Sequence, residues 1–251
     1  MLEVKEILSA GFLDFKAALS LKGKLYFSES QTYGRALAPV SRILSIWASR
    51  GGRRKLDDSL SEALKSIIIH FAGAAPRVVA PRSTASPVLV FTDGACEEAF
   101  TSVGGAMWAD GIVECFGAEI PPEVCQSWTS KVDQTQVIGQ AELFPVLVAK
   151  LTWKKHLAGR RAIYFLDNES ARIALVKAYS PVLPSLKIIM QCLEWDFVNR
   201  SDSWYARVPT ASNISDGPSR MSLAVMQGQF PSARVVPPAF PDGVPRGKVL
   251  S

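Results

Sequence analysis

Two short apolar runs in the middle of the chain each end in an aspartate. Residues 87–93 read Pro-Val-Leu-Val-Phe-Thr-Asp, and residues 162–167 read Ala-Ile-Tyr-Phe-Leu-Asp. Unbroken apolar runs of this length are typical of strands buried on both faces of a sheet. Residues 103–109 and 112–120 predict a hairpin, because the Asp110-Gly111 pair between them supplies the positive φ angles of a two-residue turn.

Helical patterns separate the other strands of this middle part. Leucines at helical spacing predict a helix over residues 141–157, in which Pro145 occupies or kinks the first turn. A helix, a second helix, a strand and a helical turn are then predicted over residues 168–179, 184–199, 202–208 and 213–221. Such an alternation is typical of an α/β domain. We therefore predict a five-stranded mixed sheet with helices on both faces over residues 85–221.

The two ends of the chain differ from this middle part. Residues 1–84 contain a basic run at 50–55 (Arg-Gly-Gly-Arg-Arg-Lys) and a helical pattern over 56–71, so a small, mainly helical region is expected there. Prolines and serines between residues 76 and 87 predict a linker. Residues 222–251 carry five prolines with little periodicity, which predicts an extended or disordered tail.

The composition is that of a folded protein with a modest positive charge. Apolar residues make up 48% of 251 positions, and 28 Lys+Arg against 23 Asp+Glu give a net charge of +5, which favours a polyanionic partner. Four cysteines without a Cys-x-x-Cys pair favour neither a zinc site nor a disulfide framework. Neither a signal-like start nor an apolar run of the ~20 residues that span a bilayer occurs, so we expect a cytoplasmic or nuclear protein without a membrane partner.

Four acidic residues stand where their carboxylates are able to converge. Asp93 and Asp167 end the two apolar runs, and the carboxyl ends of parallel strands meet at one edge of a sheet. Glu142 opens an apolar helix, and Asp216 follows a helix-start pattern near the end of the predicted domain. Each acid alone has an ordinary explanation, because acids often cap turns or stabilise the first turn of a helix.

Together in one small domain, the four acids favour a divalent metal site. Two like charges ~4 Å apart repel by roughly 4 kcal/mol at an effective dielectric constant of about 20, so converging carboxylates need a counter-charge. Mg²⁺ prefers carboxylate and water oxygens, and a pair of such ions stabilises the attacking and leaving oxygens of a phosphodiester displacement. The pattern therefore predicts phosphoryl-transfer hydrolysis.

Four segments around these acids resemble the acidic motifs of type-1 ribonuclease H domains. They read Phe-Thr-Asp-Gly-Ala (91–95), Gln-Ala-Glu-Leu (140–143), Phe-Leu-Asp-Asn (165–168) and Val-Pro-Thr-Ala-Ser-Asn-Ile-Ser-Asp-Gly-Pro-Ser-Arg (208–220), in the family's order. The resemblance implies a ribonuclease H-like fold and an endonuclease that hydrolyses the RNA strand of RNA–DNA hybrids. It also implies that the catalytic acids, which hold two Mg²⁺ or Mn²⁺ ions, are Asp93, Glu142, Asp167 and Asp216.

The last motif looks most like the form found in reverse-transcriptase polyproteins of DIRS-like retrotransposons and hepadnavirus-like elements. Upstream, residues 21–27 (Leu-Lys-Gly-Lys-Leu-Tyr-Phe) and Gly34-Arg35 resemble the segment that follows the polymerase palm. This resemblance implies that residues 1–84 are a remnant of a thumb or connection region. No Tyr-x-Asp-Asp occurs in the sequence, so no polymerase active site is expected, and the polymerase part of a polyprotein is a candidate partner.

The resemblance departs from the family pattern at one place. Many family members carry a histidine in the loop before the last acid, whereas the last histidine of this chain is His156. Arg207 or Ser212 are candidates to replace it, or turnover is slow. A basic group at residues 154–161 either contacts backbone phosphates or forms a solvated face.

Three other classes of protein stay open at this point. The main alternative is a catalytically weak ribonuclease H-like module that binds nucleic acid, as a connection domain does, although such a module would not need to retain four acids. A haloacid-dehalogenase-like phosphatase would need a second aspartate where Phe91 stands. A proofreading exonuclease would need a glutamate where Ala95 stands.

Overall fold

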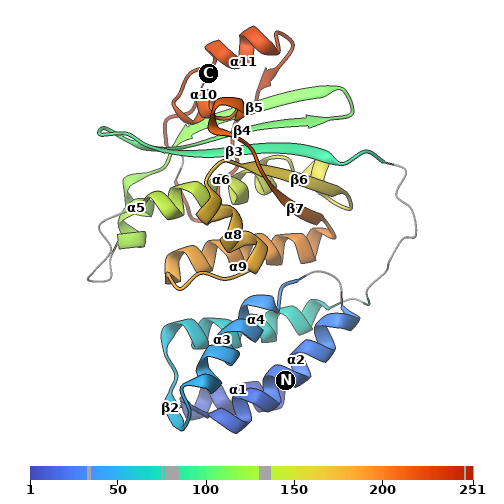
Figure 1. The fold of residues 1–251 in the computed structure, drawn as a ribbon, viewed down its shortest axis with the longest axis vertical. Coiled ribbons are helices and arrows are strands. Elements are labelled where there is room, and N and C mark those ends of the chain that lie inside the picture. Colours follow the sequence, from blue (N-terminus) through green and yellow to red (C-terminus); the bar gives the residue numbers. More distant parts are fainter. Residues whose placement is uncertain (33–34, 75, 77–84, 130–136, 246, 251) are drawn as a thin grey trace.

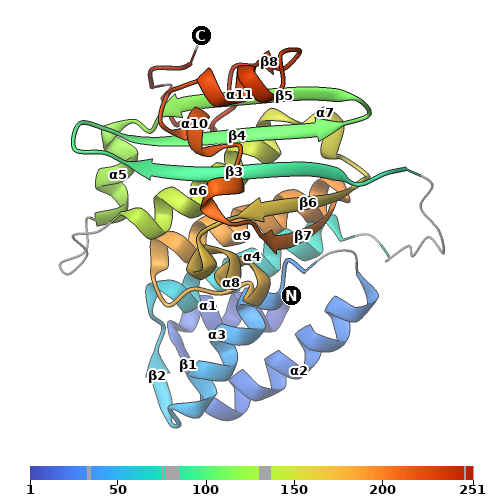
Figure 2. The same cartoon turned by 45° about the horizontal axis from the view of Figure 1, so that its top comes forward.

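The computed structural model has a central sheet with helices on both faces and a group of N-terminal helices beneath it (Figure 1; Figure 2). It describes residues 1–32, 35–74, 76, 85–129, 137–245 and 247–250. Most of the linker predicted between residues 76 and 87, including Pro81, Ser83 and Thr84, lies outside the described residues.

The central sheet is mixed and confirms the predicted α/β fold class, with six strands in the described residues where five were predicted. Its strands are β3 (Val88–Cys96), β4 (Thr101–Ala109), β5 (Ile112–Glu119), β6 (Arg161–Leu166), β7 (Asp202–Arg207) and β8 (Arg234–Val235). Their order in the sheet is β7-β6-β3-β4-β5-β8, with β4 antiparallel to both of its neighbours and β6 parallel to β3 and β7. Asp110 and Gly111 join β4 to β5 with φ angles of 52° and 78°, as the hairpin prediction requires.

One face of the sheet is covered by helices that come from the middle of the sequence (Figure 1). They are α5 (Pro122–Thr129), α6 (Ile138–Thr152), α7 (Lys154–Leu157), α8 (Glu169–Lys177) and α9 (Leu183–Asn199). Helix α6 packs along β3 and β4, and α9 packs against α6. The predicted helix over 141–157 is thus divided into α6 and α7, with Trp153 at the junction.

A buried ion pair joins α6 to α9 inside this layer. The Lys150 ammonium, which is fully buried, lies 2.5 Å from a carboxylate oxygen of Asp196 and donates to the Ser203 hydroxyl at 2.7 Å. It also lies over the Tyr164 ring, 4.5 Å from the centroid. The aliphatic stem of Lys150 explains why this position follows the apolar spacing of the helix. The pair fixes α6, and with it the helix start that carries Glu142.

The other face of the sheet is covered by the C-terminal part of the chain, which corrects one prediction. The tail after residue 221, expected to be extended or disordered, forms α11 (Ala224–Gln229) and β8, and Met226 is fully buried against Ala106, Val113 and Cys115. Farther on, the Leu250 amide donates to the Gly117 carbonyl at 2.8 Å. Apolar anchors and a free strand edge order this segment despite its prolines, because a proline removes only its own amide donor.

Between β7 and this tail lie two short helical segments. They are the 3₁₀ turn η1 (Thr210–Ser212) and α10 (Asp216–Ser219), and α10 packs on β3, β4 and β5. Helix α10 lies within the helical turn predicted over residues 213–221, and η1 precedes that range. Helix α10 therefore lies across the sheet on the opposite face from α6, so that both helices flank β3.

The N-terminal region is mainly helical, as the sequence predicts. It consists of α1 (Leu2–Ala10), β1 (Phe12–Asp14), α2 (Phe15–Gln31), α3 (Ala38–Ser49), β2 (Arg53–Lys55) and α4 (Asp58–Gly73). Its helices share a hydrophobic cluster that also takes in Leu186 of α9, so the region packs against the helical layer below the sheet. None of the helices in the described part of the chain combines the length and the apolar character needed to cross a membrane.

Candidate metal centre

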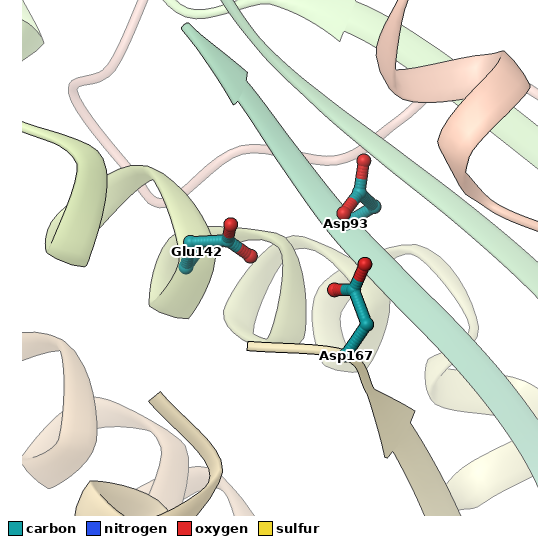
Figure 3. Close-up of side chains that lie close together, drawn as sticks. All are labelled: Asp93, Glu142 and Asp167. Atoms are coloured by element: carbon teal, nitrogen blue, oxygen red, sulfur yellow. The ribbon is translucent and has the colours of Figure 1, made fainter. Parts of the chain in front are cut away.

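Three of the four predicted acids lie together at one edge of the sheet. Asp93 comes from β3, Asp167 directly follows β6, and Glu142 comes from the start of α6 (Figure 3). One oxygen from each carboxylate lies within 4.8 Å of the others, which makes this group the acidic cluster. The structure therefore brings together side chains that are separated by up to 74 positions in the sequence.

The strand ladder explains why Asp93 and Asp167 meet. Strands β3 and β6 are parallel, and their paired residues run from Val88 opposite Ala162 to Phe91 opposite Phe165. This constant offset puts Asp93 level with Asp167. The two side chains share a face because alternate residues of a strand point the same way. Contrary to the simplest expectation, β3 does not end at Asp93 but continues to Cys96, paired with β4.

A glycine next to Asp93 allows Glu142 to approach. A Cβ atom at Gly94 would overlap the backbone carbonyl of Ala141 and would lie 2.9 Å from the Glu142 amide nitrogen. Only a residue without a side chain lets the first turn of α6 come so close to β3. Gly94 thus sets the distance between the two elements that carry Asp93 and Glu142.

Burial and neighbouring acids make Asp93 a weak acid in the metal-free protein. Its residue is only 5% exposed, and burial raises the pKa of its carboxyl to about 6. The Ser219 hydroxyl, 2.5 Å from an Asp93 oxygen, opposes this shift, while the negative charges of Asp167 and Asp216 add to it. The carboxylate is therefore held in a fixed orientation but is poorly neutralised.

Glu142 is perturbed still more strongly. Burial, followed by the charges of Asp93 and Asp167, raises the pKa of its carboxyl to about 8. Hydrogen bonds from the Asn168 side chain and the Gly94 backbone oppose the shift. Asn168 also caps α8 by accepting from the Ala171 amide at 3.0 Å, so its position is fixed. Asp93 is thus buried and Glu142 partly buried, and both carboxyl groups have raised pKa values although the Arg220 charge lowers that of Asp93.

Asp216 lies close to the acidic cluster but is not a member of it. Its carboxylate accepts from Arg220 at 3.1 Å, and Arg220 reaches Glu97 at 2.5 Å with its other end. Asp216 is still near enough to raise the pKa of Asp93. A Cβ atom at Gly104 would overlap the Ser219 backbone, so this glycine lets α10 lie against β4 beside Asp93.

Two functional candidates were missed in the sequence, namely Ser219 and Arg220. Both lie in the 208–220 motif, but the sequence pattern does not show that the Ser219 hydroxyl donates a hydrogen bond to Asp93, 126 positions earlier. Arg207, proposed as a substitute for the missing histidine, lies near Glu169, where a hydrogen bond from Arg172 and then the charges of Arg172 and Arg207 lower the pKa of the carboxyl. The cation that lies beside the acids is Arg220.

The donor set fits a hard divalent cation. The acidic cluster offers only oxygen ligands, which Mg²⁺ and Mn²⁺ prefer. Burial first, and then the neighbouring carboxylates, raise the carboxyl pKa values of Asp93 and Glu142. The four cysteines do not contribute to the acidic cluster, since Cys115 and Cys192 are buried elsewhere and the group contains no sulfur ligand. Mutual repulsion would be relieved by a bound ion.

Comparisons with known proteins found similar structures but no similar sequence. No protein-family model and no curated protein matches the chain. One similar solved structure is RNase H1 from the halophilic archaeon Halobacterium salinarum, with 19% identity and a TM-score of 0.40, covering 55% of this chain and 98% of that chain. Another is the N-terminal RNase H domain of a Mycobacterium tuberculosis protein fused to maltose binding protein, with 16% identity and a TM-score of 0.36. The match covers 57% of this chain and 98% of that chain. At these values the two matches assign neither an activity nor a substrate to this chain.

Proposed function

We propose that the chain is a metal-dependent endonuclease that hydrolyses the RNA strand of RNA–DNA hybrids. Asp93, Glu142, Asp167 and Asp216 are its proposed catalytic and metal-binding acids. The observation that supports this most is the convergence of the first three within 4.8 Å of one another. They come from three separate motifs of the ribonuclease H resemblance, and Asp93 is nearly fully buried, which is unusual for an acid without a functional partner.

The residues of the site divide into ligands and supports. Two Mg²⁺ or Mn²⁺ ions, when bound, stabilise the attacking and leaving oxygens of a phosphodiester. The proposed oxygen ligands that would hold them are Asp93, Glu142 and Asp167 of the acidic cluster, together with Asp216 beside it. Ser219 orients Asp93 by a hydrogen bond, and Arg220 holds Asp216 beside the acidic cluster. The positions of all these groups are set by strands and helix starts, which suits a reaction that depends on geometry.

The sequence supports an origin in a reverse-transcriptase polyprotein. The form of the motif over 208–220 resembles that of DIRS-like and hepadnavirus-like elements. Residues 1–84 would then be the remnant of a thumb or connection region, and the helices described up to Gly73 share one hydrophobic cluster. On this proposal the chain descends from the nuclease end of such a polyprotein.

A second candidate function is nucleic-acid binding with weak turnover, as in a connection-type module. Two observations favour it. First, Asp216 pairs with Arg220 and lies outside the acidic cluster. Second, the exposed η1 turn consists of Thr210, Ala211 and Ser212, whereas many ribonuclease H family members carry a histidine in this loop. The two candidates share a substrate and differ in whether it is cut.

One cleavage experiment separates the candidates. The purified chain is incubated with Mg²⁺ and end-labelled RNA–DNA hybrid, duplex RNA or duplex DNA, next to two variants. We expect cutting of the RNA strand of the hybrid alone by the wild type and by the exposed-site control Asp242→Asn, and none by Asp93→Asn. Equal cutting by Asp93→Asn would refute the assignment of the site. Hybrid binding without any cutting by the wild type would favour the connection-type module.

A further inference from the structure

Positive charge is distributed very unevenly along the chain. Residues 1–84 contain 13 lysines and arginines against 7 aspartates and glutamates, a net charge of +6. Residues 85–251 contain 15 against 16, a net charge of −1. A nucleic acid is bound mainly through its phosphates, so a protein that binds one needs a basic surface. The part of the chain that carries the acidic cluster does not supply a net positive charge, whereas the N-terminal part does.

The basic run singled out in the sequence forms a defined structure within the N-terminal part. Arg53, Arg54 and Lys55 make up β2, pair antiparallel with β1, and are all exposed. We call this unit, residues 12–14 and 53–55, the basic hairpin. Two contacts hold its side chains in place: Arg53 lies over the Phe12 ring at 5.3 Å, and Arg54 donates to the Arg50 carbonyl at 2.7 Å. Because neighbouring strand residues point to opposite faces, the hairpin presents the exposed cations Arg53 and Lys55 on one face and Arg54 on the other.

The basic hairpin faces the same side of the molecule as the acidic cluster. In both views β2 lies toward the side to which β3 points with its carboxyl end, and Figure 2 shows β1 beside it (Figure 1; Figure 2). Asp93 lies in the second half of β3, and Asp167 directly follows the parallel strand β6. The other basic group, at Lys154 and Lys155 in α7, precedes the opposite end of β6. In that group Arg160 is engaged by Asp110 at 2.5 Å, which favours a structural role there.

We propose that the basic hairpin binds the phosphate backbone of the nucleic acid whose scissile bond lies at the acidic cluster. This inference rests on the proposed function, and it assigns to the N-terminal region the task of holding the substrate. The hairpin makes contacts without sequence preference, since Arg and Lys address phosphates and no groove-reading element accompanies them in β1 or β2. The ligand is therefore an RNA–DNA hybrid held by charge.

The salt dependence of binding measures these contacts directly. Fluorescence anisotropy of a labelled hybrid in Ca²⁺ is recorded over a range of KCl concentrations for the wild type and for Arg53→Gln/Arg54→Gln/Lys55→Gln. A plot of log affinity against log salt concentration has a negative slope, and each lost phosphate contact makes it less steep by about 0.9. We therefore expect the slope of the triple variant to be smaller in magnitude by about 2 to 3. Between ~50 and ~200 mM salt the wild type would then lose roughly 40-fold more affinity than the triple variant.

Two matched variants guard against trivial explanations. Lys154→Gln/Lys155→Gln also removes exposed positive charge but should leave the slope nearly unchanged, because α7 lies away from the acidic cluster. Arg53→Lys/Arg54→Lys keeps the charge and should keep most of the slope. Circular dichroism melting of each variant shows whether the fold is retained. Equal slopes for the wild type and the triple variant, or an equal loss from the α7 double variant, would overturn the proposal.

The outcome for the hairpin can be told apart from the outcome for the nuclease. Cleavage of the hybrid with an unchanged KM in the triple variant would refute the hairpin proposal and leave the proposed function standing. Hairpin-dependent binding without cleavage by the wild type would refute the proposed function and leave the hairpin proposal standing. A raised KM with an unchanged kcat in the triple variant would support both. Hairpin-dependent binding to anionic vesicles but not to the hybrid would replace the nucleic acid by a membrane surface and overturn the proposal.

Discussion

Replacing Glu142 by glutamine should stabilise the metal-free protein while abolishing cleavage. In the folded protein the pKa of Glu142 is raised to about 8 from its usual value of 4.5, chiefly by burial. Above about pH 4.5 the unfolded chain therefore releases a proton that the folded protein still binds. Ionisation favours the unfolded state, and the wild type loses stability as pH rises, until the folded carboxyl has also ionised near pH 8. Glutamine does not titrate, so the variant escapes this loss.

The size of the effect follows from the two pKa values. Each pH unit between them changes the free energy of unfolding by about 1.4 kcal/mol, so the variant gains at most about 3.5 kcal/mol at pH 7. For a protein of this size that corresponds to a rise in Tm of about 7 to 14 °C. The gain is an upper limit, because glutamine accepts weaker hydrogen bonds from Asn168 and Gly94 than a carboxylate does. Near pH 4 the two proteins should melt together.

Thermal unfolding followed by circular dichroism in EDTA, from pH 4 to pH 9, measures this directly. Glu123→Gln, at an exposed acid in the first turn of α5, is the matched control and should follow the wild type. Excess Mg²⁺ should raise the Tm of the wild type and barely affect Glu142→Gln, because a ligand that binds the folded state stabilises it. The reasoning is refuted if Glu142→Gln is no more stable than the wild type at pH 8 in EDTA.

Three further predictions concern the chemistry of the site. Asp167→Asn should abolish hybrid cleavage with a Tm close to that of the wild type, since the change removes a charge and leaves the volume; retained cleavage would contradict its role. Mg²⁺ or Mn²⁺ should support cutting, Ca²⁺ should support binding without cutting, and EDTA should stop the reaction, whereas full activity in EDTA would exclude a metal-dependent mechanism. Histidine introduced singly at Thr210, Ala211 or Ser212 in the exposed η1 turn should raise kcat in at least one variant, by up to about 10²-fold, without changing hybrid affinity. If none of the three is faster, the reaction does not need such a group there.

The strands were predictable from the sequence because their signals are local. The apolar runs before Asp93 and Asp167 and the turn at Asp110-Gly111 depend on residues within a few positions of one another, and β3, β5 and β6 appear where those signals stand. The order of strands and helices then follows from simple rules of α/β architecture. The meeting of Asp93 with Asp167 was also predictable, because parallel neighbours end at the same edge.

Features that depend on distant residues were not predictable in this way. The tail after residue 221 is ordered by Met226, whose contacts on β4 and β5 are more than 100 positions away. Asp216 was expected among the metal ligands, but in the structure its carboxylate pairs with Arg220 and lies outside the acidic cluster. Which of these two positions the carboxylate takes depends on tertiary packing, which the sequence pattern does not show. Lys150 followed the spacing of an apolar helix face, and only the structure reveals Asp196 beneath it.

The pairing of β3 with β6 has a consequence for how this chain tolerates change in length. The two aspartates are brought level by hydrogen bonds between backbones, over four consecutive rungs, and not by the path of the chain between them. Residues added to or removed from the connecting turns do not change the pairing of these rungs. An example is the turn at Asp110 and Gly111, which lies at the end of the sheet where β3 begins. A single residue inserted within either strand, between its rungs and its aspartate, shifts one carboxylate by about 3.3 Å and turns it to the opposite face. The lengths of the loops can therefore change without moving the two aspartates. The spacing from Val88 to Asp93 and from Ala162 to Asp167 must stay constant.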